Sequence, residues 1–265
     1  MIKIFFSIFA LAVLVVSPQL LSQPQISTLQ ADGPNQGMAA YELIKNFAGK
    51  RSIESPDLYP ENHPGIHHIY EQTDNTVGHH FVFLLHRDLD KDRDKYIKFS
   101  DRQRNEIKAY SGSQSRLKGY EGETLTYRWK FKLDANMSLS KNFSHFFQLK
   151  SVDNGIGMPI LTISGVNYRG DKWLGLSHAA VQKSSILLKT PWDEVSGVWL
   201  EAECKVTYSD SGALMVKVKR VSDNKTVMAY ESKDIDMWRG TKKEHFVGPK
   251  WGFYRSLKSK YMLGS

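Results

Sequence analysis

The sequence predicts an all-β protein in which two antiparallel sheets pack face to face. Three observations point to this fold class: apolar and polar residues alternate over several short segments, turn residues separate these segments, and only one short stretch is typical of a helix. The chain has 265 residues, of which 41% are hydrophobic and 24% charged. This composition supplies enough apolar side chains for one buried core and excludes a disordered or fibrous chain.

The N-terminal segment is expected to be a secretory signal peptide that covers residues 1–22. Lys3 is followed by an uncharged apolar run from Ile4 to Val16, and Ser17-Pro18 and a polar stretch come next. Such a run is too short to span a bilayer comfortably. We therefore expect a secreted or periplasmic protein that has no membrane contact once this segment is removed.

Residues 23–60 are expected to form an irregular lead-in, because four prolines are spread through them. One short helix is expected within this lead-in, over residues 38–47. The rest of the chain, residues 61–265, is expected to form a single β-jelly-roll domain.

The clearest strand signals lie in the second half of the chain. Residues 127–133, 198–208 and 214–219 each alternate apolar with charged or polar side chains, and a turn signal at Ser211-Gly212 separates the last two. Cys204, the only cysteine, lies on the apolar side of its segment. We therefore expect it in the core, and with one cysteine no disulfide can form within the chain.

Three further segments, 101–108, 143–150 and 249–255, carry polar side chains at alternate positions, so each strand has one polar face. The polar set comprises Arg102, Arg104, Glu106, Lys108, Gln148, Lys150, Lys250 and Tyr254. The intervening residues expected in the core between the sheets include Ile107, Phe147, Leu149, Trp251 and Phe253. Any one of these strands also fits a solvated outer face.

The three motifs resemble those of polysaccharide lyases with a β-jelly-roll fold. Their order is Arg-x-Glu-x-Lys at 104–108, Gln-x-Lys at 148–150 and Lys-x-Gly-x-Tyr at 250–254, and it resembles the alginate lyases. The wider segments resemble the heparin lyase I and glucuronan lyase group more closely. The resemblance covers roughly residues 79–257 and implies a concanavalin-like jelly roll whose concave face forms a glycan cleft. Lys150 stands where the alginate lyases carry the His that serves as base.

The resemblance implies an exported enzyme that cleaves a uronic-acid polysaccharide by β-elimination. The C5 proton leaves only when the neighbouring carboxylate is neutralised, and Gln148 and Arg104 are the donors expected to do this. Tyr254 is expected to protonate the leaving oxygen and, with Lys250 lowering its pKa, to remove the C5 proton. Gly252 is expected to leave room for a sugar ring. The expected substrate-binding residues are Lys250, Lys150, Arg102, Glu106 and Lys108.

The histidines add one candidate for the catalytic base, so the base is Tyr254, His86 or Lys150. His86 ends the apolar segment 81–85, from where it is expected to reach the cleft. His145 shares the parity of Phe147, which predicts a buried side chain. His63 and His67 are separated by Pro64-Gly65, and without a helix to align them no metal site is expected there.

Four carboxylates, those of Asp88, Asp90, Asp92 and Asp94, occur at alternate positions, a spacing that calcium loops use. Basic residues lie between them and favour a solvated charged loop instead. No cofactor is therefore expected to be required, although calcium remains an alternative for this loop.

The formal net charge of +8 predicts attraction to polyanions. Export favours an acidic polysaccharide as the partner over nucleic acid, for which no motif is found. We expect a monomer. Two alternatives to the lyase function remain: a non-catalytic carbohydrate-binding jelly roll, and a concanavalin-like glycoside hydrolase. The second needs two carboxylates across a cleft, whereas Glu106 is the only one in the three motifs.

Overall fold

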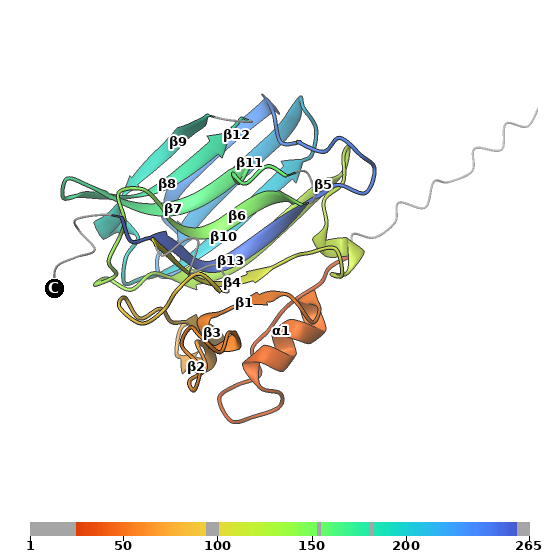
Figure 1. Cartoon of the computed structure of the whole chain (residues 1–265). Coiled ribbons are helices and arrows are strands. Elements are labelled where there is room, and N and C mark those ends of the chain that lie inside the picture. The colour runs from red at the N-terminus through yellow and green to blue at the C-terminus, as the bar shows by residue number, and fades with distance from the viewer. Residues whose placement is uncertain (1–24, 94–100, 153–154, 181–182, 259–265) are drawn as a thin grey trace, which may run out of the picture.

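The computed structural model describes residues 25–93, 101–152, 155–180 and 183–258. Two antiparallel sheets pack face to face, one of seven strands and one of four, as Figure 1 shows. The fold class predicted from the sequence, a β-jelly-roll sandwich, is confirmed. The expected signal peptide and Asp94 lie outside the described residues.

The order of the strands within each sheet differs from their order along the chain. The seven-stranded sheet runs β1 (Ile53–Glu54), β4 (Arg102–Lys108), β13 (Phe246–Ser256), β6 (Ser144–Val152), β7 (Leu161–Tyr168), β8 (Asp171–Ala179) and β9 (Ser184–Pro191). The four-stranded sheet runs β12 (Thr226–Ile235), β11 (Gly212–Arg220), β10 (Trp199–Thr207) and β5 (Thr124–Lys132).

The main core lies between the two sheets and follows the alternation in the sequence. Phe147, Leu149 and Phe253 of the seven-stranded sheet pack with Cys204 and its apolar neighbours on β10, and Trp251 packs against them partly buried. Cys204 is fully buried as expected, and burial raises the pKa of its thiol. The polar residues between these core positions therefore lie on the outer face of the seven-stranded sheet.

The lead-in forms a second, smaller core beside β4. The helix α1 (Ala40–Ala48) lies close to the range predicted for it, and the hairpin of β2 (Ile69–Asp74) and β3 (Gly78–Phe83) lies nearby (Figure 1). Ile107 is buried in this second cluster, with Ile53 of β1. The expectation that Ile107 packs between the sheets is therefore wrong, because the four-stranded sheet does not extend under this edge and the lead-in covers it instead.

Short 3₁₀ helices complete the connections, at η1 (Pro56–Leu58), η3 (Ser115–Leu117) and η4 (Trp192–Glu194). Within the four described ranges no helix is long and apolar enough to cross a membrane.

Candidate active site

The three polar strands predicted from the sequence are neighbours in the seven-stranded sheet. β13 pairs with β4 on one side and with β6 on the other. The register places Lys250 opposite Lys108 and Gln148, and it places Tyr254 opposite Arg104. Residues directly opposite one another in an antiparallel pair share a face. The polar set of the three motifs therefore gathers on the outer face of the sheet.

A buried carboxylate that the sequence analysis missed, Glu54 on β1, forms the centre of this face. Its oxygens lie 2.5 Å from Lys250 Nζ, 2.7 Å from Lys108 Nζ and 3.4 Å from Arg104 Nη1. Arg93 also pairs with it. Burial alone would raise the pKa of Glu54, but these four cations hold it well below its usual value. Glu54 is thus ionised and neutralises part of the positive charge of the site.

Arg104 and Gln148 are occupied by carboxylates of the protein itself. Arg104 donates to Asp92 Oδ1 at 2.7 Å and to Glu106 Oε2 at 2.6 Å, and the Gln148 amide donates to the other oxygen of Glu106. Both side chains are buried. Burial lowers the pKa of Arg104, but Glu54, Glu106 and Asp92 raise it well above its usual value. The two donors expected to neutralise a substrate carboxylate therefore already hold protein carboxylates.

Tyr254 lies at the more accessible end of the same face. Its hydroxyl accepts a hydrogen bond of 3.2 Å from Arg102 Nη1, and its ring centroid lies 3.6 Å from the Arg104 guanidinium carbon. Burial raises the pKa of Tyr254, although Arg104 and Arg102 act in the opposite direction. The expected lowering by Lys250 does not occur, because the Lys250 amine is directed to Glu54 and Glu106. Tyr254 is therefore a protonated phenol at neutral pH.

His145 is largely buried and hydrogen-bonded to Ser164 at 2.7 Å, as expected, but it joins the site on the outer face instead of sharing the face of Phe147. The register between β13 and β6 shifts between Trp251 and Tyr254, and the shift between β6 and β7 falls between His145 and Phe147. This bulge places both Phe146 and Phe147 in the core and turns His145 to the outer face, opposite Tyr254. The rings of His145 and Tyr254 are 6.0 Å apart. Burial, together with the charges of Arg104 and Lys250, lowers the pKa of His145 to about 3, so its imidazole is neutral.

Lys150 follows Gln148 on the same face and is half-buried. Its Nζ donates to the carbonyl oxygens of Ile156, at 3.2 Å, and of Gly157. Burial, with the nearby cations Lys250 and Arg104, lowers the pKa of Lys150 to about 8. Among the described residues, the Lys150 amine contacts backbone carbonyl oxygens, whereas the other cations of the polar set pair with carboxylates.

Gly252 has a role different from the expected one. It adopts φ of +132°, and a Cβ atom there would lie 2.3 Å from the Asn105 carbonyl oxygen and 2.8 Å from Glu106 Cα. Glycine is therefore required for the close approach of β13 to β4. The absent side chain makes room for the neighbouring strand rather than for a sugar ring.

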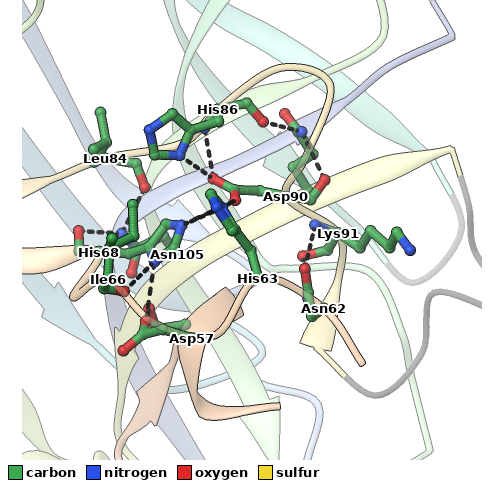
Figure 2. Close-up of polar contacts among 12 residues, drawn as sticks. Asp57, Asn62, His63, Ile66, His68, Leu84, His86, Asp90, Lys91 and Asn105 are labelled. Atoms are coloured by element: carbon green, nitrogen blue, oxygen red, sulfur yellow. Dashed lines mark hydrogen bonds and ion pairs between the residues drawn. The ribbon is translucent and has the colours of Figure 1, made fainter. Parts of the chain in front are cut away.

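His86 does not lie with Tyr254. Gln103, which points away from the outer face, donates to the carbonyl oxygens of His86 at 2.7 Å and Arg87 at 2.6 Å. His86 therefore lies on the core-side face of β4, where it meets His63, His68 and Asp90 (Figure 2). Burial lowers the pKa of His68, but hydrogen bonds to Asp57 and Asp90 raise it to about 9.

The acidic loop does not converge on a calcium site. Asp88 pairs with Arg87 on the surface, Asp90 joins the histidines, and Asp92 binds Arg104. Asp90 and Asp92 thus act on opposite faces of β4, because the loop passes around the edge of this strand. The three described carboxylates of the expected calcium loop share no partner.

Comparisons with known proteins found similar structures but no matching sequence. No family model matches the chain, and no curated protein matches it. The chain is similar to the marine PL-14 alginate lyase from Aplysia kurodai, with 11% identity and a TM-score of 0.47 over 74% of this chain and 80% of that one. It is similar to alginate lyase A1-II′, a member of polysaccharide lyase family-7, with 14% identity and a TM-score of 0.45 over 84% and 92%.

A third similar structure is the endo-β-1,4-glucuronan lyase from the fungus Trichoderma reesei. Its identity to this chain is 14% and its TM-score is 0.39. The match covers 58% of this chain and 63% of the length of the fungal lyase.

Proposed function

We propose that the chain is an exported polysaccharide lyase that cleaves a uronic-acid-containing acidic polysaccharide by β-elimination. One observation carries this proposal: the Tyr254 hydroxyl and the neutral His145 imidazole lie on one sheet face beside a buried network in which four cations outnumber three carboxylates. This arrangement supplies a proton donor, a proton acceptor and a positive field, which are the three elements that the elimination needs.

In the proposed reaction Tyr254 is the acid and His145 is the base. The C5 proton passes to the imidazole, a double bond forms between C4 and C5, and the bond from C4 to the glycosidic oxygen breaks. The phenol protonates the departing oxygen. Burial is the main cause of the low pKa of His145, and a bound uronate carboxylate would offset the second cause, the charges of Arg104 and Lys250, which makes the imidazole a stronger base. The bound substrate would thereby strengthen His145, the base that removes its C5 proton.

Lys150 is proposed to bind a carboxylate of the substrate, which predicts a pH dependence of affinity. The amine is charged below its pKa of about 8 and neutral above it, so affinity for a polyuronate should fall as the pH rises through 8. Lys150→Met should weaken binding about 10- to 100-fold at neutral pH, as expected for a charge-assisted hydrogen bond. The effect should shrink at high salt.

The measurement is the dissociation constant of a polyuronate by isothermal titration calorimetry on either side of pH 8. Lys172→Met on β8 is the matched control, because Lys172 is an exposed lysine of the same sheet. An identical pH dependence in wild type and Lys150→Met would exclude Lys150 as the carboxylate ligand.

The proposed activity is tested by incubating the protein with alginate, glucuronan, heparin-like and ulvan-like chains. Each elimination creates an unsaturated uronate, whose ultraviolet absorbance should rise with time for at least one of these polymers. Substrates that are bound without such a rise would contradict the lyase proposal.

A non-catalytic glycan-binding protein is a second candidate, and one observation favours it. Arg104 and Gln148, the donors expected to neutralise a substrate carboxylate, are saturated by Asp92 and Glu106. If these bonds persist in the complex, the chain should bind acidic glycans and release no unsaturated ends. The same assay therefore separates the two candidates.

A further inference from the structure

On the core-side face of β4, three imidazoles and one carboxylate converge from the segment that precedes β2 and the loop that follows β3. We propose that His63, His68, His86 and Asp90 bind one transition-metal ion, and that Zn²⁺ is the ion that fits. Their ligand atoms all lie within 4.8 Å of one another. Figure 2 shows the three rings turned toward the Asp90 carboxylate. This site is separate from the proposed lyase site, and the inference goes beyond that function.

Two of the distances among these ligand atoms match the edges of a small tetrahedron. With metal–ligand bonds of about 2.0 to 2.1 Å, neighbouring ligand atoms of a tetrahedral zinc site lie about 3.3 Å apart. Here His68 Nε2 lies 3.2 Å from His63 Nδ1, and His86 Nδ1 lies 3.3 Å from Asp90 Oδ2. Two further edges, from Asp90 Oδ1 to His68 and to His63, are shorter, at 2.9 and 2.5 Å. With Asp90 Oδ1 as the carboxylate ligand, these two edges must lengthen for an ion to enter, and the edges to the His86 ligand atom lie within 4.8 Å.

The donor set selects the kind of metal. Three imidazole nitrogens and one carboxylate oxygen suit Zn²⁺, which prefers four nitrogen, sulfur or oxygen ligands. Calcium takes six to eight oxygen ligands, and this cluster presents a single carboxylate. The calcium considered from the spacing of the aspartates is thus replaced by a different metal at a different set of residues.

The ligands are held in place by a second layer of contacts. His68 Nδ1 lies 3.1 Å from the Ile66 carbonyl oxygen and 3.2 Å from Asp57 Oδ1, which leaves Nε2 for the ion. Gln103 donates to the Asp90 carbonyl at 2.7 Å and holds the loop on β4. These contacts orient both ligands before any metal binds.

One ligand atom has an unmet requirement that a metal would satisfy. His86 Nδ1 is buried and forms no hydrogen bond with the residues that the structure describes, although it faces Asp90. The His68 and Asp90 side chains are fully buried, whereas those of His63 and His86 are 21% and 34% exposed. An ion can therefore reach the cluster from the side of His63 and His86.

Four protein ligands make a closed site, which indicates a structural role. The ion would join the segments around His63 and His68 to the loop at His86 and Asp90. That loop continues to Asp92, which binds Arg104 on the other face at 2.7 Å. Metal binding should therefore fasten the segment before β2 to the loop after β3 and stabilise the folded chain.

The test is the binding of Zn²⁺, Co²⁺ and Ca²⁺ to the full-length protein after treatment with a chelator. We expect one Zn²⁺ per chain by calorimetry and by elemental analysis, and a rise in the midpoint of thermal unfolding. Co²⁺ should produce the visible bands of a tetrahedral nitrogen and oxygen site, and Ca²⁺ should change nothing. Absence of stoichiometric Zn²⁺ binding would overturn the proposal.

His86→Gln is the decisive variant, since the lost nitrogen makes no hydrogen bond to any described residue and the fold should be retained. It should weaken Zn²⁺ binding by more than about 100-fold, which exceeds the usual effect of losing an outer partner. His79→Gln, an exposed histidine on the adjacent β3, is the control and should bind Zn²⁺ as wild type does. Equal binding by both variants would also overturn the site. None of these measurements uses a glycan, so their failure is distinct from a failure of the lyase proposal.

Discussion

Tyr254→Phe should reduce turnover on a polyuronate by about 10²- to 10⁴-fold while it leaves glycan affinity nearly unchanged. The substitution removes only the hydroxyl that would protonate the leaving oxygen. The ring keeps its position over Arg104, at 3.6 Å, and its contact with Phe143, at 4.9 Å between centroids. The lost hydrogen bond from Arg102 costs about 1 kcal/mol of stability, because Arg102 still pairs with Asp101.

The measurement compares initial rates of unsaturated-uronate formation with dissociation constants for the same polymer. Tyr168→Phe is the control, since Tyr168 is an exposed tyrosine at the end of β7 in the same sheet. A Tyr254→Phe variant that keeps most of its activity would show that Tyr254 is not the acid, and Lys150 would then be the candidate that protonates the leaving oxygen.

Glu54→Gln should lower the free energy of unfolding by about 3 to 5 kcal/mol. Glu54 is the shared partner of Lys250, Lys108, Arg104 and Arg93, and its side chain is 3% exposed. A neutral amide in its place leaves these buried cations without their central counter-charge. Because the pKa of Glu54 is lowered in the folded state, its stabilisation is present above its ordinary pKa and is lost as the pH falls through the folded-state value. Stability of the variant should therefore depend less on acidification than that of wild type.

Urea unfolding at neutral and acidic pH measures both effects. Glu203→Gln on β10 is the matched control, since Glu203 pairs with Arg128 at 2.9 Å on the surface, where ion pairs contribute less than about 1 kcal/mol. A loss no larger for Glu54→Gln than for Glu203→Gln would show that the buried network does not depend on this charge.

The fold class was predictable because strand alternation is a local property. The residues of β10 alternate in the sequence and alternate in burial, and Cys204 falls where its neighbours place it. The alternation of β4 likewise places Arg102, Arg104 and Glu106 on the outer face, although the burial of this strand does not alternate. Which strands become neighbours is decided by contacts between distant segments, and alternation carries no information about it.

The site was predictable only in part, for three physical reasons. A bulge in β6 reverses the parity of His145, and no residue pattern of that strand announces it. Glu54 lies in a two-residue strand within a proline-containing segment, too short to show any period. Lys250 and Gln148 were expected to contact the substrate, but carboxylates from distant parts of the chain, Glu54 and Glu106, already bind them.

The cluster of His63, His68, His86 and Asp90 was also predictable only in part. His63 and His67, the pair with regular spacing, do not meet, and His67 is largely exposed. His63 instead meets His68, His86 and Asp90, which are brought together by the packing of two loops on β4. The number of histidines in this part of the sequence indicated the cluster, whereas the regular spacing of His63 and His67 did not.

The strand order of the seven-stranded sheet also governs how the chain folds. β13 is inserted between β4 and β6, so its contacts join residues 152 positions apart at Arg102 and Tyr254, and 196 apart at Glu54 and Lys250. Closing such long loops costs entropy and makes folding slow. Until β13 inserts, β4 and β6 each present an open edge on which partly folded chains can aggregate. Because β13 carries both Lys250 and Tyr254, a chain with an assembled site has also closed these two edges.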